Sequence, residues 1–184
     1  EVVPSFDHPD IIAGQGTVGL EIAEQSQKLG LAVDQVLICC GGGGLTSGSA
    51  VALKARLPDV SIYAVEPEGF DDTMRSLQAG ERVRVDPEAR SICDALLTES
   101  PGRLTFDIMR RLVAGGLVVT EQEVKAAMRF AFRNLKIVTE PGGAVALAAV
   151  LSGRIDTADK TTAIVISGGN VDAALFASIQ TERT

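Results

Sequence analysis

The fold of this chain is decided by the stretch Val36-Leu37-Ile38-Cys39-Cys40-Gly41-Gly42-Gly43-Gly44-Leu45-Thr46-Ser47-Gly48. Its first five residues are apolar, as in a strand that is buried on both faces. The four glycines that follow fill no space and cost backbone entropy, so they fit a loop that a ligand approaches closely. From residue 46 or 47 to residue 57 the composition favours a helix. The stretch therefore predicts a strand, a loop and a helix in that order.

The glycine loop, residues 41–44, also predicts an anion site. Loop N–H groups and the positive end of a helix dipole would converge there and favour a phosphate. A Walker loop would need Gly-Lys-Ser/Thr, whereas Leu45-Thr46 follow the last glycine. A dinucleotide site is a weaker alternative, with Glu66 near the place of its acidic residue. An ordinary turn would need only one or two glycines, so a monophosphate held by backbone amides fits better.

Chain-wide composition limits the class of protein. A length of 184 residues with 19 glycines and no low-complexity tract indicates one compact α/β domain, or most of one. The net charge of −7 and the lack of a Lys/Arg cluster argue against a nucleic-acid partner. No apolar run approaches the length of a membrane span, and residues 1–5 do not resemble a signal peptide. We therefore expect a cytoplasmic protein with no membrane partner.

The cysteines and the single histidine are not expected to be catalytic. Cys39 and Cys40 are adjacent in a predicted buried strand, and Cys93 has no histidine nearby in the sequence. No spacing fits a metal site, so we expect reduced core thiols. His8, beside Pro9, is predicted to be a surface loop residue.

The remaining pattern alternates helices and strands. Two apolar runs joined by a helix predict a right-handed βαβ crossover with parallel pairing. Thr120 and Glu123 predict a capping box. The pattern as a whole predicts an α/β fold of three layers, with a mostly parallel sheet between helices. Strands are expected at residues 36–40, 60–65, 81–86, 117–119 and 162–166, and helices at 18–29, 46–57, 73–79, 104–114, 120–135 and 144–151, with a last helix ending at 179.

Four carboxylates follow the second strand, in Glu66-Pro67-Glu68-Gly69-Phe70-Asp71-Asp72. They stand at the edge where α/β sheets bind ligands. Carboxylate and carbonyl oxygens suit Mg²⁺, Ca²⁺ or Mn²⁺. A solvated acidic loop explains the composition equally well.

A second glycine loop, Ser167-Gly168-Gly169-Asn170, follows the predicted strand at residues 162–166. A hydroxyl followed by two glycines suits contact with a flat ligand ring, although it is also found in ordinary turns. Carboxyl ends of parallel strands share one edge of a sheet. The two glycine loops are therefore expected to share a ligand.

Taken together, these residues resemble the threonine dehydratase and serine racemase family of pyridoxal-phosphate enzymes, which have the tryptophan-synthase-β-like fold, fold type II. The likeness runs nearly end to end through Ile12-Ala13-Gly14-Gln15-Gly16-Thr17, residues 41–44, Glu66-Pro67, Glu140-Pro141 and Ser167-Gly168-Gly169-Asn170.

The resemblance implies roles for particular residues. The cofactor phosphate would be held by the amides of Gly41, Gly42, Gly43, Gly44 and Leu45. Ser167 would face the pyridine nitrogen, with Gly168 beside the cofactor. A divalent cation would be held by Glu66, the backbone carbonyl of Phe70, and Asp72.

The implied activity is dehydration and deamination of threonine or serine to a 2-oxo acid and ammonia, in a homodimer. A serine cannot keep the ring nitrogen protonated as an aspartate does, which suits β-elimination. Alternatives within the family are a serine or aspartate racemase and a hydroxyaspartate dehydratase. Alternatives of another class are a non-catalytic module that binds a phosphate ligand and a nucleotide-dependent oxidoreductase.

The main departure from the family is the missing Schiff-base lysine, which stands in a Ser-x-Lys motif that this chain lacks. None of the five lysines is in a suitable place: Lys28, Lys54, Lys125, Lys136 and Lys160. We therefore expect residues 1–184 to be the C-terminal part of the large domain, inactive alone, with the N-terminal part and small domain absent and no regulatory domain. A smaller departure is Ala95, where relatives often carry glycine.

Overall fold

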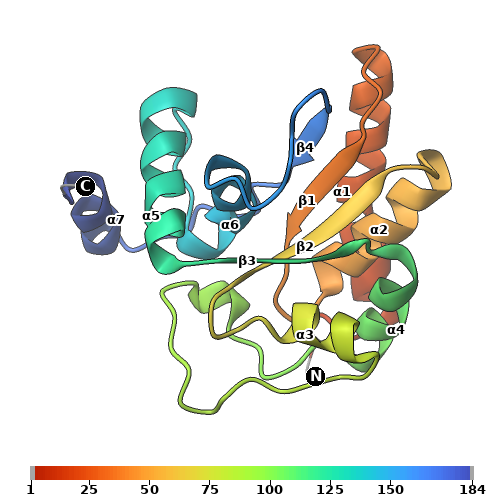
Figure 1. The fold of residues 1–184 in the computed structure, drawn as a ribbon, viewed down its shortest axis with the longest axis horizontal. Helices are drawn as coiled ribbons and strands as arrows, with labels where there is room; N and C mark the ends of the chain where they lie inside the picture. Colours follow the sequence, from red (N-terminus) through yellow and green to blue (C-terminus); the bar gives the residue numbers. More distant parts are fainter. Residues whose placement is uncertain (1–2, 183–184) are drawn as a thin grey trace.

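The computed structural model describes residues 3–182 and shows a parallel sheet between two groups of helices (Figure 1). Within these residues the sheet has four strands in the order β3-β2-β1-β4. Their bounds are β1 Gln35–Cys39, β2 Ser61–Pro67, β3 Gly115–Val119 and β4 Thr162–Ile164. All three neighbouring pairs are parallel. The predicted α/β class is confirmed.

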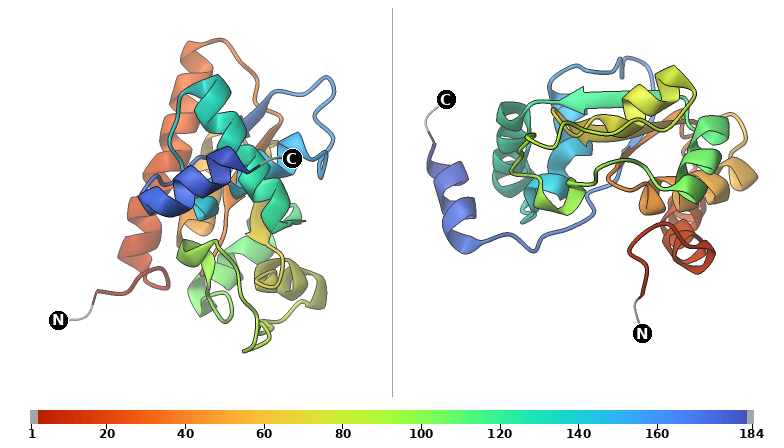
Figure 2. Two further views of the ribbon diagram at one scale, coloured as in Figure 1. Left: turned by 90° about the vertical axis from the view of Figure 1, so that its left-hand side faces the viewer. Right: turned by 90° about the horizontal axis from the view of Figure 1, so that it is seen from below.

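Helices cover both faces of the sheet, with α1, α2 and α4 on one side and α5, α6 and α7 on the other (Figures 1 and 2). The α-helices are α1 Pro9–Lys28, α2 Gly44–Arg56, α3 Asp72–Ala79, α4 Arg103–Leu112, α5 Glu121–Phe130, α6 Pro141–Leu151 and α7 Ala173–Thr181. A 3₁₀ turn η1 spans Asp94–Leu96, and a π-helical turn η2, Ala131–Leu135, continues α5. No helix within residues 3–182 is both long enough and apolar enough to cross a membrane.

Alternate residues of β1 face opposite helical layers. Leu37 and Cys39 belong to a core that includes α5 and α6, whereas Val36 and Ile38 pack against α2. Every residue of β1 is buried, as the apolar run predicts. The glycine loop that follows β1 is therefore fixed between the two layers.

The first helix begins earlier than the sequence predicts. We expected it from residue 18, but α1 begins at Pro9 and is capped by the side chain of His8, which is a surface residue as predicted. Gly16, one of the glycines that precede the predicted helix, instead packs within α1 against α2, where a β-carbon would lie 3.1 Å from the carbonyl oxygen of Gly48. A β-carbon on Gly19 would lie 2.5 Å from the carbonyl oxygen of Ser49. Close helix packing offsets the cost of glycine inside a helix.

Two of the predicted strands also differ from the structure, whereas the predicted capping box is confirmed. Residues 81–86 form no strand, and their one backbone hydrogen bond across the loop is donated by the Val85 N–H to the Glu99 carbonyl oxygen. Residues 162–166 were expected to be buried, but β4 is half-buried because it is an edge strand of the described sheet. Thr120 and Glu123 exchange both bonds of the predicted box.

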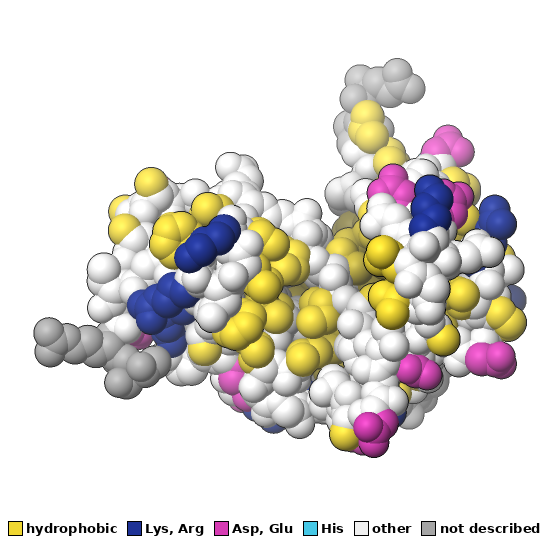
Figure 3. All heavy atoms as spheres, turned by 90° about the horizontal axis from the view of Figure 1, so that it is seen from above, with side chains coloured by type: hydrophobic (Ala, Val, Ile, Leu, Met, Phe, Trp, Pro, Cys, Tyr) yellow, Lys and Arg dark blue, Asp and Glu magenta, His cyan; other side chains and the backbone are white. Residues whose placement is uncertain are grey.

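Hydrophobic side chains remain exposed on the described surface. They gather over the middle of the face shown in Figure 3. The end of α5 and the segment after it contribute five large exposed side chains: Phe130, Phe132, Leu135, Ile137 and Val138. Exposed apolar surface of this extent is typical of a protein face that binds another apolar surface.

Candidate functional site

The glycine loop leaves a row of backbone N–H groups without protein acceptors. Within residues 3–182 no hydrogen bond is donated by the N–H groups of Gly41, Gly42, Gly43, Gly44 or Leu45. The first bond of α2 runs from Ser47 N to Gly43 O, at 2.8 Å. Gly42, Gly43 and Gly44 are buried, and buried N–H groups require a partner. Free donors at a helix N-terminus suit the predicted anion.

Neighbouring side chains hold the loop in this shape. Gly43 has φ 92°, a conformation that glycine adopts without strain. The Thr105 hydroxyl donates to the carbonyl oxygen of Gly42 at 2.6 Å. The ring of Phe6 lies so close that a β-carbon on Gly42 would be 2.3 Å from Phe6 Cγ. Packing against Phe6 therefore requires glycine at position 42, a role that the sequence alone did not predict.

The two glycine loops meet at one cavity. This cavity, of about 570 Å³, is lined by residues 41–45 on one side and by Ser167 on the other. Ala95, at the predicted departure from the family pattern, also lines it. The shared cavity is the arrangement that parallel strands predict.

Ser167 follows β4 and is exposed to the cavity. Its Oγ accepts a hydrogen bond from Cys39 Sγ at 3.0 Å. Gly168 is not among the residues that line the cavity. Its carbonyl oxygen accepts from Glu140 N and from the Thr139 hydroxyl, each at 3.0 Å. Gly168 therefore fastens the Ser167 segment to the start of α6.

The three cysteines are buried and free, as predicted. Burial raises the pKa of Cys39, and burial with the nearby Glu66 carboxyl raises the pKa of Cys40. Burial also raises the pKa of Cys93 to about 12. The thiols are therefore protonated at neutral pH, which argues against a nucleophilic role.

Glu66 and Asp72 form the buried part of the acidic loop. Glu66 accepts the N–H groups of Thr73 and Met74, each at 2.8 Å, through separate carboxylate oxygens. Both carboxylate oxygens of Asp72 are buried without a hydrogen-bond partner in the described chain. Burial and the neighbouring Asp72 raise the pKa of Glu66 to about 8, and burial raises the pKa of Asp72 to about 7. An unpartnered buried carboxylate is costly, so a cation would fit Asp72.

Phe70, whose carbonyl was predicted as a third ligand, is buried in the same loop. Its N–H donates to Pro67 O at 3.0 Å. Across residues 3–182, no group of three His, Cys, Asp or Glu side chains could hold a metal. The predicted set of two carboxylates and a carbonyl would therefore need water to complete the coordination of a cation.

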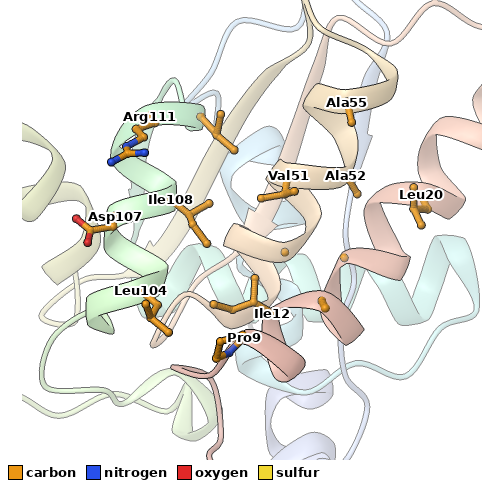
Figure 4. Close-up of a pocket in the computed structure, with 14 residues that line it drawn as sticks. Pro9, Ile12, Leu20, Val51, Ala52, Ala55, Leu104, Asp107, Ile108 and Arg111 are labelled. Carbon is orange, nitrogen blue, oxygen red and sulfur yellow. The ribbon is translucent and has the colours of Figure 1, made fainter.

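A larger hollow of about 770 Å³ lies between α1, α2 and α4 (Figure 4). Its side chains are mostly apolar, such as Ile12 and Val51, with Asp107 and Arg111 on α4. It includes neither the glycine loop nor Ser167. A ligand pocket needs several convergent polar groups, so we assign the ligand to the smaller cavity.

Comparisons relate the chain to known proteins. Residues 1–168 match the family described as "pyridoxal-phosphate dependent enzyme". The chain is 39% identical over 178 residues to L-threo-3-hydroxyaspartate ammonia-lyase of a Pseudomonas species, covering 97% of this chain and 54% of that protein. It is 41% identical over 182 residues to serine racemase of Dictyostelium discoideum, covering 97% and 55%. The chain thus spans about half the length of these curated relatives.

A solved structure supports the fold. A threonine deaminase from T.th. superimposes with a TM-score of 0.86 and 44% sequence identity, over 91% of this chain and 61% of that chain. The predicted architecture is therefore found in a protein of related sequence.

Proposed function

Because the chain belongs to the family of pyridoxal-phosphate dependent enzymes, we propose that it is the cofactor-phosphate part of an ammonia-lyase that dehydrates threonine or serine. The products would be a 2-oxo acid and ammonia. The proposal is carried by one observation, the cavity shared by the unpartnered loop amides and the Ser167 hydroxyl. When bound, pyridoxal phosphate supplies the electron sink for loss of the α-proton and the β-hydroxyl.

The phosphate is assigned to the N–H groups of residues 41–45. The dipole of α2 adds positive potential at the same point. No Lys or Arg of the described chain lines the cavity, so backbone groups would hold the dianion. Thr105 supports this role by bonding the Gly42 carbonyl, which keeps the loop amides turned toward the cavity.

Ser167 is assigned to the ring nitrogen of the cofactor, and Gly168 to the support of Ser167. The hydroxyl is exposed to the cavity and, within residues 3–182, donates to no protein acceptor. A neutral hydroxyl does not stabilise a protonated ring as a carboxylate would. This choice favours β-elimination over reactions that need a stronger electron sink.

A divalent cation, Mg²⁺, Ca²⁺ or Mn²⁺, is assigned to Glu66, the Phe70 carbonyl and Asp72. The support is the pair of buried, unpartnered oxygens of Asp72 beside a second buried carboxyl group. A cation there would neutralise both carboxylates and join the end of β2 to the start of α3.

The cofactor-binding lysine is assigned to a part of a longer polypeptide that precedes residues 1–184, which would then be the C-terminal part of the large domain. None of the lysines in residues 3–182 lines the shared cavity. The curated relatives are about twice as long as the chain. We also assign the full protein to the cytoplasm and to a homodimer, and sedimentation of the full-length protein would test the dimer.

Racemisation is the second candidate activity, because a serine racemase and a hydroxyaspartate ammonia-lyase are similar to the chain to nearly the same degree. Assays of the full-length protein with L-threonine, L-serine and L-threo-3-hydroxyaspartate separate the candidates. Release of a 2-oxo acid and ammonia supports elimination, whereas a D-amino acid supports racemisation. Neither product would favour a non-catalytic phosphate-binding module.

Cofactor binding tests the site itself. In the full-length protein, inorganic phosphate should compete with pyridoxal phosphate, and pyridoxal without phosphate should bind at least about tenfold more weakly, ~1.4 kcal/mol. Borohydride reduction should attach the cofactor to a lysine outside residues 1–184. Equal affinity for the two forms of the cofactor would contradict the assignment of the glycine loop, and attachment within residues 1–184 would contradict the assignment of the lysine.

A further inference from the structure

The thiol of Cys39 lies at the boundary between the hydrophobic core and the shared cavity. Cys39 is the last residue of β1, is only 4% exposed, and lines the cavity. Its Sγ donates a hydrogen bond to Ser167 Oγ at 3.0 Å. The bond joins the end of β1 to the segment that follows its parallel neighbour β4, at the point where Ser167 faces the shared cavity.

We propose that Cys39 is a positioning residue that directs the Ser167 hydroxyl hydrogen toward the ring nitrogen of the cofactor. A hydroxyl has one hydrogen and two lone pairs. The Cys39 S–H occupies one lone pair of Ser167, and no acceptor within residues 3–182 takes the Ser167 hydrogen. That hydrogen is therefore left for the cavity. The inference rests on the proposed function, which supplies the ring nitrogen.

The thiol is suited to this role because it remains a donor. Burial raises the pKa of Cys39, so its S–H persists at neutral pH. Its side chain is packed in the core with Leu37 and Val65, which fixes its direction. A thiol is also a weak donor, so it orients the hydroxyl without transferring a proton to it.

The direction of the Ser167 hydrogen has a chemical consequence. A donating hydroxyl bonds to an unprotonated ring nitrogen, whereas an accepting hydroxyl would bond to a protonated one. With the Cys39 thiol in place, the first arrangement is favoured. Without the thiol the hydroxyl can rotate, and the protonation of the ring is less well controlled.

The S–H stretching band tests the pair in the full-length protein without cofactor. Cys39→Ala identifies the band, and Ser167→Ala should move it to higher frequency because the thiol loses its acceptor. Cys40→Ala is the matched control, since that adjacent buried thiol contacts Thr73 and Met109 instead. A Cys39 band that Ser167→Ala leaves in place would overturn the proposal, whatever the protein binds.

The nitrogen resonance of ¹⁵N-labelled pyridoxal phosphate tests the effect on the ring. Cys39→Ala should shift this resonance in the full-length protein, whereas Cys39→Ser, which keeps a donor, and Cys40→Ala should not. Cofactor affinity should fall by no more than about tenfold in Cys39→Ala, since one hydrogen bond is lost and the loop amides are unchanged.

An unshifted resonance in Cys39→Ala would overturn the positioning role while leaving the proposed function intact. Failure of the unaltered protein to bind pyridoxal phosphate would overturn the proposed function and the ring contact together. The S–H band would still report whether the Cys39–Ser167 bond exists, so the two failures are distinguishable.

Discussion

The ring of Phe6 covers Gly42 so closely that a β-carbon on Gly42 would lie 2.3 Å from Phe6 Cγ. A β-carbon on Gly44 would likewise lie 3.0 Å from Phe6 Cβ. The segment before α1 therefore occupies space that the sequence alone would leave to a ligand. A side chain added at Gly42 would therefore disturb the packing against Phe6 even when no phosphate is bound.

Gly42→Ala should destabilise the cofactor-free protein by about 1–3 kcal/mol, because the new methyl group overpacks against Phe6. Chemical denaturation measures the cost. Phe6→Ala should vacate the space, so the same substitution should cost less in that background. Gly14→Ala is the control, since a β-carbon at Gly14 meets nothing within 4 Å. If Gly42→Ala destabilised the unaltered protein and the Phe6→Ala variant equally, the new methyl group would not be clashing with Phe6.

A divalent cation should raise the melting temperature of the full-length protein by about 3–5 °C at a hundredfold excess over its dissociation constant. The gain should disappear in Glu66→Gln and in Asp72→Asn, because each variant removes a proposed ligand. Differential scanning calorimetry with Mg²⁺, Ca²⁺ and Mn²⁺ measures it. Asp71→Asn is the control, since Asp71 pairs with Arg75 at 3.0 Å instead. An undiminished gain in Asp72→Asn would exclude this site.

In EDTA, the stability contributed by Glu66 and Asp72 should fall as the pH rises. Their pKa values are raised from ordinary values of 4.5 and 3.8 to about 8 and about 7. The folded state then binds more protons than the unfolded state, so the contribution is complete below about pH 4 and is lost progressively up to about pH 8. Asp72→Asn should therefore gain stability relative to the unaltered protein as the pH increases. Urea denaturation across this pH range measures the difference in stability between the two proteins. A difference that does not change with pH would contradict the raised pKa values.

Local patterns account for the parts of this structure that the sequence predicts. The apolar run at residues 36–40 and the capping box of Thr120 act through neighbours in the chain. The shared cavity follows from them, since parallel strands end at one edge of a sheet. Glu66 and Asp72 lie at the end of β2 and the start of α3, as the order of elements predicts, although composition alone does not show that Asp72 is buried and unpartnered.

Contacts between distant segments account for what the sequence does not predict. The close approach of Gly16 and Gly19 to α2 and the covering of Gly42 by Phe6 are contacts of this kind. The bond from Cys39 to Ser167 joins residues 128 positions apart. None of these contacts leaves a periodic signal, because each involves one side chain and a partner brought near only by the folded chain.

Asp7 makes a distant contact of the same kind, and its loss should loosen the glycine loop. Its carboxylate accepts from the N–H groups of Arg103, Leu104 and Thr105 at 2.9, 2.8 and 3.2 Å. It thereby caps α4, whose own N-cap, Gly102, has no side chain. Asp7→Ala should cost about 1–2 kcal/mol, the usual loss for a capping side chain.

The same substitution should weaken phosphate binding, because the first turn of α4 carries Thr105, whose hydroxyl holds the Gly42 carbonyl. Denaturation and titration with pyridoxal phosphate measure the two effects on one variant of the full-length protein. Asp7→Asn, which keeps one acceptor oxygen, should lie between the alanine variant and the unaltered protein. Asp10→Ala removes an exposed carboxylate from the first turn of α1 and serves as the control. If Asp7→Ala lost stability but kept its affinity for the cofactor, the position of α4 would not affect phosphate binding by the glycine loop.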